Sequence, residues 1–284
     1  MKKFLIFLGA CLVLGCVFLF SYTPSLSEKH GQIDTKLFIG DSFQQALIVA
    51  FGGGGGKNDW ARPYMAEKRA LLLEKGYAIL AIAYFASSEH TPEELDRISL
   101  NAIADSILDI ARRHPKIDEN KIALIGGSKG GELVLNLACR YEEFKAVAAL
   151  SSSHVSFPAL TPFANTSSWM YEGNEVPYVP APLSTIGPAL KGDLYAAFEL
   201  MLEDEEAAKL AEIEVENIQG GILLISAKDD EQWAASRMSR KMMARLAEKD
   251  FSFPYEHIEL EQGGHVEPLN HLDKVIQFFD QQFK

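Results

Sequence analysis

Residues 126–130, Gly-Gly-Ser-Lys-Gly, place one serine among glycines, directly after an apolar run and directly before a helical pattern. This is the G-x-S-x-G arrangement, in which a serine occupies a strained turn between a strand and a helix. Small neighbours allow the strand and the helix to pack closely, and the turn lifts the Ser128 hydroxyl above the edge of the sheet. The pattern predicts nucleophilic attack on a carbonyl, with the amide of Lys129 aimed at the developing oxyanion.

A serine hydroxyl needs a general base, and the base needs a carboxylate that orients it. In folds that use this turn, the chain order is serine, acid, histidine. Asp229 and Asp230 follow one strand-like run, and His265 follows the next, in a loop with two glycines. Both positions lie at the carboxyl ends of predicted strands, where the sites of open α/β sheets collect. The residues alone leave Asp229 and Asp230 as alternatives for the acid.

Five other histidines fit the role of the base less well. His90 and His114 lie in or near helical patterns and are expected at the surface. His154 follows a strand end and could line a site, but it precedes the acid in the chain. His257 lies inside a strand pattern, and His271 stands where it would cap the last helix.

Five consecutive glycines, Gly52 to Gly56, precede Lys57 and raise the question of a phosphate-binding loop. The Walker A pattern fails, because its first glycine would fall on Phe51 and its Ser/Thr on Asn58. The dinucleotide pattern fails, because its third glycine would fall on Lys57. In folds with a serine turn, the second oxyanion donor comes from the loop after an early strand. We therefore expect Gly53, or its neighbour Gly54, to supply that amide.

The elements that must position these residues alternate along the chain. Apolar runs of strand length occupy 46–51, 77–85, 121–126, 145–151, 221–227 and 255–260. Helical patterns occupy 62–75, 92–113, 129–140, 234–249 and 271–283. Runs that are apolar on both faces and separated by helices predict an α/β fold, with a mostly parallel sheet covered on both sides.

Residues 152–217 break this alternation with prolines and aromatic side chains, and they turn helical over 193–212. A connection of this length is more often functional than idle. We expect a lid-like insertion whose aromatic residues form a wall of the acyl pocket.

Composition excludes some classes of function. The net charge of −12 argues against nucleic acid, because such binding relies on Lys and Arg neutralising phosphates. Cys139 is the one cysteine outside the N-terminal apolar run, so no disulfide is expected within the body of the chain. No cysteine or histidine spacing indicates zinc, and the expected chemistry needs no metal or organic cofactor.

The N-terminus differs from the rest of the chain. Lys2 and Lys3 precede an uncharged apolar stretch from Phe4 to Phe20. We predict a signal or membrane-anchor segment over 1–27 and a catalytic domain over 28–284 outside the cytoplasm, because positive charge stays inside. A lipoprotein attached through Cys11 or Cys16, or a secreted form, is the alternative.

Three stretches resemble a known family: FGGGGG with the ARPYMAEKRALLLEKGYAILAIAYF that follows it closely, IALIGGSKGGELVLNLA, and ILLISAKDDEQW with GGHVEP. They are similar to the C-terminal catalytic domain of acyl-CoA thioesterases and bile acid-CoA:amino acid N-acyltransferase, an α/β-hydrolase related to dienelactone hydrolase. The resemblance runs from about residue 40 to the end. It implies Ser128 as nucleophile, Asp230 as acid and His265 as base. Since the acyltransferase uses cysteine, Ser128 points towards hydrolysis.

The resulting expectation is a serine hydrolase that cleaves a thioester or carboxylic ester through an acyl-enzyme. A peptidase or acyltransferase on the same fold, or a non-catalytic binding protein, is the alternative. The family's mammalian enzymes carry a β-sandwich before this domain, whereas only residues 21–45 separate the apolar stretch from the first matching strand. Acyl-CoA and exported esters therefore both stay open as substrates. For the Lys129 side chain, we expect either full solvation or contact with an anionic group of the substrate.

Overall fold

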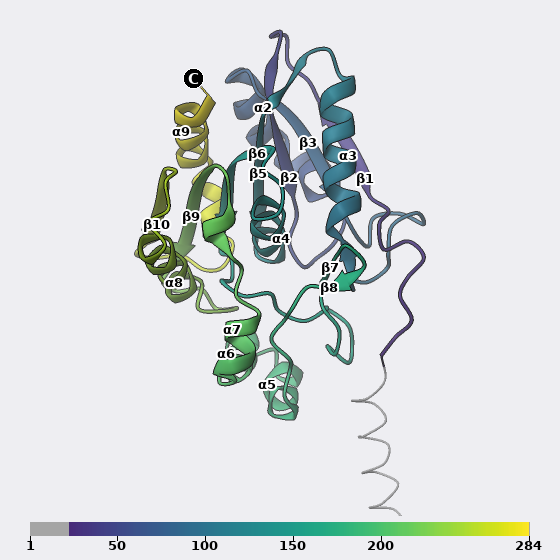
Figure 1. Ribbon diagram of the computed structural model, residues 1–284, viewed down its shortest axis with the longest axis vertical. Coiled ribbons are helices and arrows are strands. Elements are labelled where there is room, and N and C mark those ends of the chain that lie inside the picture. Colours follow the sequence, from purple (N-terminus) through teal and green to yellow (C-terminus); the bar gives the residue numbers. More distant parts are fainter. Residues whose placement is uncertain (1–22, 284) are drawn as a thin grey trace, which may run out of the picture.

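The computed structural model describes residues 23–283, and a seven-stranded sheet forms its centre (Figure 1). Its strands are β1 (Asp34–Phe38), β2 (Gln45–Phe51), β3 (Ala78–Ala83), β5 (Ile117–Gly127), β6 (Phe144–Leu150), β9 (Gly221–Ala227) and β10 (Tyr255–Leu260). They lie in the order β1-β3-β2-β5-β6-β9-β10. Every neighbouring pair is parallel except β1 with β3, which is antiparallel. The predicted α/β fold is confirmed.

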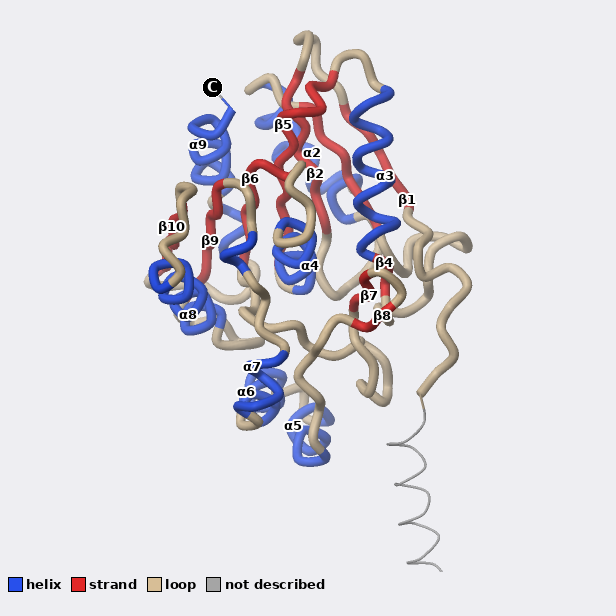
Figure 2. Tube along the Cα trace, in the orientation of Figure 1, coloured by secondary structure: helices blue, strands red, loops and turns tan. Residues whose placement is uncertain are grey.

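Helices cover both faces of this sheet (Figures 1 and 2). They are α2 (Ala66–Glu74), α3 (Leu100–Arg113), α4 (Lys129–Ala138), α8 (Ala235–Glu248) and α9 (Leu272–Phe283). Successive residues of a strand point to opposite faces. Accordingly, Leu47 and Val49 of β2 join the core that contains α3, α4 and α8, whereas Ile48 and Ala50 join the core of α2 and α9. Burial on both faces explains why the strands read as continuous apolar runs.

All six predicted strands are present, and two of the predicted helices begin later than expected. The pattern at 62–75 becomes an α-helix at Ala66, after a 3-10 turn over Pro63–Met65. The pattern at 92–113 becomes helical only at Leu100. Arg97 has a φ of 46°, which a helix does not accommodate. The Ser99 side chain then caps the helix by accepting a hydrogen bond from the Ala102 amide at 3.2 Å. The stretch before the cap carries the short strand β4 (Ile98–Ser99) instead.

The insertion at 152–217 leaves the sheet at the end of β6 and forms its own small layer (Figure 2). It contains β7 (Trp169–Tyr171), β8 (Asn174–Glu175), α5 (Ile186–Leu190), α6 (Leu194–Leu202) and α7 (Glu205–Leu210). A separate core joins it to the segment around α8, where Phe157 and Met201 pack with Trp233 and Met238. The insertion is therefore a packed unit held on the carboxyl-end side of the sheet.

Within residues 23–283, no helix is long and apolar enough to cross a bilayer. Most of the signal or anchor segment expected over 1–27 lies outside the described residues, as do Cys11 and Cys16. Cys139 is described and carries a free thiol.

Candidate active site

Ser128 occupies a strained turn between β5 and α4, with a φ of 57° and a ψ of −125°. Side-chain-bearing residues adopt such angles at a cost of about 1–3 kcal/mol. The adjoining glycines make the turn possible: a Cβ on Gly126 would lie 2.1 Å from the Gly130 oxygen, and a Cβ on Gly130 would lie 2.3 Å from the Gly52 oxygen. The chain therefore accepts backbone strain at one serine and removes the bulk around it.

The glycine run brings Gly53 beside this serine. A Cβ on Gly53 would lie 3.2 Å from the Ser128 Cβ and 3.7 Å from its Oγ, whereas one on Gly54 would meet Leu160 at 2.9 Å. Of the two glycines considered, Gly53 is thus the one packed against Ser128. Neither the Gly53 amide nor the Lys129 amide donates a hydrogen bond to any residue of the described chain.

His265 and Asp230 form a buried pair. The two carboxylate oxygens of Asp230 lie 2.9 and 2.8 Å from Nδ1 of His265. Asp230 is 5% exposed and His265 is 6% exposed. Asp229 is exposed to solvent. Of the two neighbouring aspartates, Asp230 is therefore the one that reaches the imidazole.

Several neighbours fix the position of His265. Glu231 accepts a hydrogen bond from the His265 amide at 2.8 Å, and this bond lowers the pKa of the Glu231 carboxyl. The Ser151 hydroxyl donates to the His265 carbonyl at 2.7 Å. The Trp233 ring lies edge-on to the imidazole, with 5.4 Å between the ring centroids. No role was expected for Glu231, Ser151 or Trp233, and only the adjacency of Glu231 and Trp233 to the Asp-Asp pair could have indicated one.

The other ring nitrogen of His265 has no hydrogen-bond partner in the part of the chain that the structure describes. A carboxylate only accepts hydrogen bonds, so Nδ1 donates to Asp230 and Nε2 is left with a free lone pair. Nε2 is buried and makes no hydrogen bond within the described residues, and this includes the Ser128 hydroxyl. Catalytic hydrogen bonds are often long until substrate binds. The structure thus brings the histidine and the aspartate into contact and leaves the serine unbonded to either.

Ser128 and His265 nevertheless line one cavity, of about 310 Å³, together with Gly53. Apolar side chains form most of its remaining wall, among them Trp60, Met65 and Leu269. Residues 59–65 and 266–269 therefore supply the wall that was expected from the insertion.

The expectation that the aromatic residues of 152–217 wall this cavity is wrong. None of the cavity's lining residues falls in that range. Phe157 stacks on Trp233 at 5.6 Å and packs on Phe198 at 4.5 Å, and Trp169 lies 5.8 Å from Tyr84. These rings are occupied in joining the insertion to the body of the protein, which is the commoner use of buried aromatic residues.

Both expectations for the Lys129 side chain are also wrong. It is 2% exposed, and its Nζ lies 2.8 and 2.9 Å from the carboxylate oxygens of Glu132, one turn along α4. It also donates to the Phe157 carbonyl at 3.1 Å and lies 5.5 Å from the centre of the Trp169 ring. Burial lowers the pKa of Lys129, and the Glu132 carboxylate opposes that shift.

Glu132 is 0% exposed and is fully engaged. Besides the lysine, it accepts hydrogen bonds from Trp169 Nε1 at 2.6 Å, from the Phe157 amide at 3.2 Å and from the Ser153 hydroxyl at 3.2 Å. All of these partners except Lys129 belong to the insertion. The first turn of α4 and the insertion are therefore locked together through one carboxylate.

Tyr84 supports the glycine run from the other side. Its hydroxyl donates to the Gly52 carbonyl at 2.9 Å. The ring is buried against Trp169, and burial, with the nearby charges of Glu132 and Asp59, raises the Tyr84 pKa. Nothing in the sequence pattern connects a residue at the end of β3 with the loop after β2, so this contact was not predicted.

The remaining histidines lie away from the Ser128 cavity. His257 bonds the Ser226 hydroxyl at 2.8 Å, and His271 pairs with Glu267 at 3.4 Å. His154 is buried in the wall of a different cavity. Within residues 23–283, no three His, Cys, Asp or Glu side chains converge as a metal site would require.

Comparison with known families identifies a match over residues 105–268 to the model described as BAAT / acyl-CoA thioester hydrolase C terminal. The chain is 25% identical to acyl-coenzyme A thioesterase 5 of Mus musculus over 245 residues, which is 84% of this chain and 53% of that protein. It is 26% identical to acyl-coenzyme A thioesterase 1 of Homo sapiens over 226 residues, which is 78% of this chain and 49% of that protein. The chain thus spans about half the length of these curated relatives.

Solved structures give the fold. Acylaminoacyl peptidase of Pyrococcus horikoshii matches with a TM-score of 0.62 at 18% identity, over 89% of this chain and 40% of that one. Acetyl xylan esterase 1 of Thermoanaerobacterium matches with a TM-score of 0.56 at 14% identity, over 89% of this chain and 80% of that one. At these identities, the likeness establishes an α/β-hydrolase fold.

Proposed function

The chain belongs to the BAAT / acyl-CoA thioester hydrolase C-terminal family, and from this premise we propose that it hydrolyses a thioester or carboxylic ester of a small acyl group. Ser128 is the nucleophile, His265 the general base and Asp230 the residue that orients the base. The observation that carries the proposal is the His265–Asp230 pair, because its imidazole keeps a free Nε2 among the described residues and His265 lines the same cavity as the strained Ser128. The serine turn and the imidazole come from sequence segments 137 positions apart, at residues 128 and 265.

Acylation begins when the Ser128 oxygen attacks the acyl carbon while its proton moves to Nε2 of His265. Asp230 holds the imidazole through Nδ1 and stabilises the imidazolium that forms. The carbonyl electron pair moves onto oxygen, and the amides of Gly53 and Lys129 bind the resulting oxyanion. When the carbon–sulfur or carbon–oxygen bond breaks, the leaving group takes the proton from Nε2, and the acyl group stays on Ser128.

Deacylation repeats these steps with water. Nε2 removes a proton from water as its oxygen attacks the acyl carbon, and the proton then passes to the Ser128 oxygen as the carboxylic acid departs. Each oxyanion donor contributes about 3 kcal/mol of transition-state stabilisation. Both amides lack other acceptors in the described chain, which suits them to this role.

The cavity limits the acyl group that fits. Its volume of about 310 Å³ lies at the lower end of small-molecule sites, which span about 300–1,000 Å³. Trp60, Met65 and Leu269 make its wall mainly apolar. We therefore expect short acyl chains to be cleaved faster than long ones.

A substrate panel tests this function. The full chain, kept in detergent, is assayed against acyl-CoA thioesters, 4-nitrophenyl esters of increasing chain length and peptide amides, with Ser128→Ala as the control. Saturable hydrolysis of esters or thioesters that is absent in the variant supports the proposal. Peptide amides as the best substrates would indicate a peptidase. Failure of a fluorophosphonate to label Ser128, together with no turnover, would overturn the assignment.

We also propose that residues 1–27 target or anchor the chain and that residues 28–284 act outside the cytoplasm. The support is the order of charge in the sequence, since Lys2 and Lys3 precede the apolar stretch and no acidic or basic residue follows until Glu28. Alkaline phosphatase fused behind residue 40 is active only after export. An inactive fusion alongside an active cytoplasmic reporter would contradict this topology and make acyl-CoA the leading substrate.

A further inference from the structure

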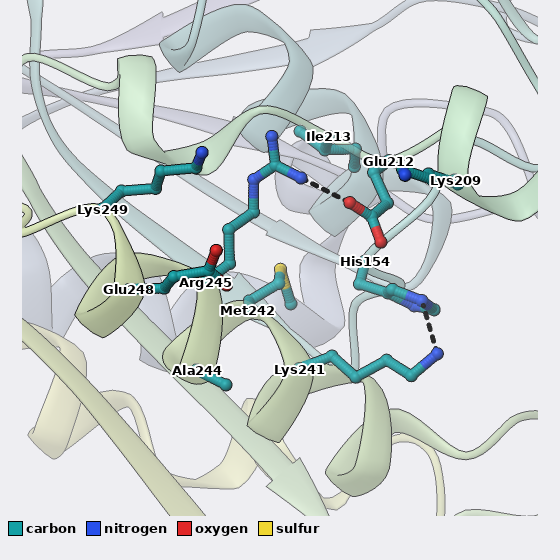
Figure 3. A pocket seen from close by; sticks show the side chains of 10 residues that line it. All are labelled: His154, Lys209, Glu212, Ile213, Lys241, Met242, Ala244, Arg245, Glu248 and Lys249. Atoms are coloured by element: carbon teal, nitrogen blue, oxygen red, sulfur yellow. Dashed lines mark hydrogen bonds and ion pairs between the residues drawn. The ribbon is translucent and has the colours of Figure 1, made fainter.

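A second cavity, of about 630 Å³, lies between α8 and the end of α7 with the residues that follow it (Figure 3). It shares no lining residue with the Ser128 cavity. Its wall combines the buried apolar side chains of Ile213 and Met242 with a concentration of basic residues. None of its lining residues takes part in the bond-making and bond-breaking steps proposed at Ser128.

Positive charge exceeds negative charge around this cavity. Four basic residues line it, Lys209, Lys241, Arg245 and Lys249, against two acidic ones, Glu212 and Glu248. The Arg245 guanidinium is already paired with two carboxylates, those of Glu212 and Glu216. In the described chain, by contrast, no carboxylate lies within ion-pair distance of Lys209, Lys241 or Lys249. Three lysines without a carboxylate partner among the described residues thus line one cavity of a chain whose net charge is −12.

A buried histidine in the wall of the cavity lies beside one of these lysines, Lys241. His154 is 4% exposed, and Lys241 Nζ approaches its Nε2 at 3.4 Å (Figure 3). An ammonium only donates, so Nε2 accepts, and the proton lies on Nδ1, which has no acceptor among the described residues. Burial, followed by the charges of Lys241 and Arg237, lowers the pKa of His154 to about 3. The imidazole is therefore neutral, and the charges that act on it are positive.

We propose that this cavity binds the phosphate groups of a small organic phosphate, through the ammonium groups of Lys209, Lys241 and Lys249. Phosphate suits the site better than a single carboxylate, because it offers several acceptor oxygens and more than one negative charge to several ammonium donors. Ile213 and Met242 provide an apolar surface for the organic part. The phosphate comes either from a leaving group of the substrate, in which case the inference rests on the proposed hydrolysis, or from a separate small molecule.

The direct test is calorimetric titration of the full chain with inorganic pyrophosphate and with ADP. Its variant is Lys241→Gln/Lys249→Gln. The matched control is Lys68→Gln/Lys191→Gln, which removes the same charge elsewhere. We expect binding that weakens with salt and that falls at least about tenfold in the cavity variant, because two charge-assisted bonds are lost. Equal loss in both double variants, no binding to the wild type, or tighter binding of polyglutamate than of ADP would overturn the proposal.

Kinetics then separate the two sources of the phosphate. If the leaving group supplies it, the cavity variant raises KM for a CoA thioester and leaves KM for a phosphate-free ester unchanged. If a separate molecule supplies it, ADP binding falls while both KM values stay the same. Each result supports the site and names its ligand. Because titration requires no turnover, failure of hydrolysis at Ser128 leaves this test intact.

Discussion

One buried polar cluster follows Ser128 in the first turn of α4 and another borders the Ser128 cavity, and the two differ in how completely they are bonded. The Lys129–Glu132 cluster is closed: every group in it has a partner, and the Glu132 carboxylate has four donors. The His265–Asp230 cluster is also buried, yet it ends in one imidazole nitrogen that has no partner within residues 23–283. A saturated cluster can only hold the fold together, whereas an unsaturated one has capacity left for a proton.

The largest effect should come from removing the proposed nucleophile or the proposed general base. We expect Ser128→Ala or His265→Ala to lower kcat by about 10⁴- to 10⁶-fold, because groups that act as a unit are lost together. The Ser128→Ala variant should unfold at nearly the wild-type temperature, since the serine side chain has no part in the closed cluster. Wild-type rates in Ser128→Ala would remove the turn from the mechanism.

Replacing each aspartate in turn by asparagine tests whether Asp230 or Asp229 orients His265. Asp230→Asn should lower kcat by about 10³- to 10⁴-fold, because an amide opposite Nδ1 favours the wrong tautomer. The exposed Asp229→Asn is the matched control and should change kcat by less than about twofold. The measurement is kcat at saturating substrate for both variants. A larger loss in Asp229→Asn would reverse the assignment.

Breaking the closed cluster should act on stability. Glu132→Gln leaves Lys129 buried opposite a neutral group, so we expect the free energy of unfolding to fall by about 3–5 kcal/mol. Denaturant unfolding measures this loss, and fluorophosphonate titration counts the sites that remain competent. The rate per competent site should stay within about tenfold of wild type. A Glu132→Gln variant that was stable but inactive would place Lys129 and Glu132 in the catalytic machinery, and the two clusters would then no longer differ in role.

His154 sharpens the comparison, because it is a second buried imidazole with an unpartnered nitrogen but has cations, in place of a carboxylate, as neighbours. Its folded-state pKa of about 3 lies below the ordinary value, so the unfolded chain binds the proton first as the pH falls. Its contribution to stability is complete above about pH 6.5 and declines towards pH 3. We expect His154→Gln to recover about 1–2 kcal/mol of the stability that wild type loses between pH 7 and pH 5, measured by urea unfolding. Parallel losses in both proteins would contradict this.

The smallest effect should come from the support beneath the glycine run. Tyr84→Phe removes the hydrogen bond to Gly52 and should lower the free energy of unfolding by about 1 kcal/mol. It should also lower kcat a few-fold without changing KM, because the proposed role of the Gly53 amide is to bind the oxyanion of the transition state. Tyr77→Phe, which removes a hydroxyl bonded to Asp280 far from the site, is the control. Equal kcat values in the two variants would leave Tyr84 with a structural role alone.

Sequence patterns predicted the parts of this molecule that depend on local periodicity. The strand at 46–51 is apolar throughout because both of its faces are buried, and the serine turn is recognisable because glycine is the residue type that its geometry allows. These features gave the α/β fold, and the family match that they suggested is confirmed. The proposed roles of Ser128, His265 and Asp230 stay predictions.

What the sequence left unresolved depends on long-range contact. Asp229 and Asp230 have the same type and nearly the same position, and only the path of the chain decides which side chain meets His265. The Lys129 side chain was expected either in solvent or against an anionic group of the substrate, because the insertion that buries it follows later in the chain. The prediction that aromatic residues of 152–217 wall the Ser128 cavity was wrong for the same reason. The number of aromatic residues in a segment does not determine which side chains each ring packs against.

The three tryptophans lie in three different environments near Ser128, the Lys129–Glu132 cluster and His265. Trp60 borders the Ser128 cavity, Trp169 bonds Glu132, and Trp233 lies edge-on to the His265 ring. Replacing each tryptophan in turn by phenylalanine would therefore show which part of the protein's fluorescence comes from which ring. Changes in the emission of Trp60, Trp169 and Trp233 would then report substrate entry, the Lys129–Glu132 cluster and the charge on the His265 imidazole, respectively. The molecule carries its own optical probes, so its events can be timed in a stopped-flow instrument without an added dye.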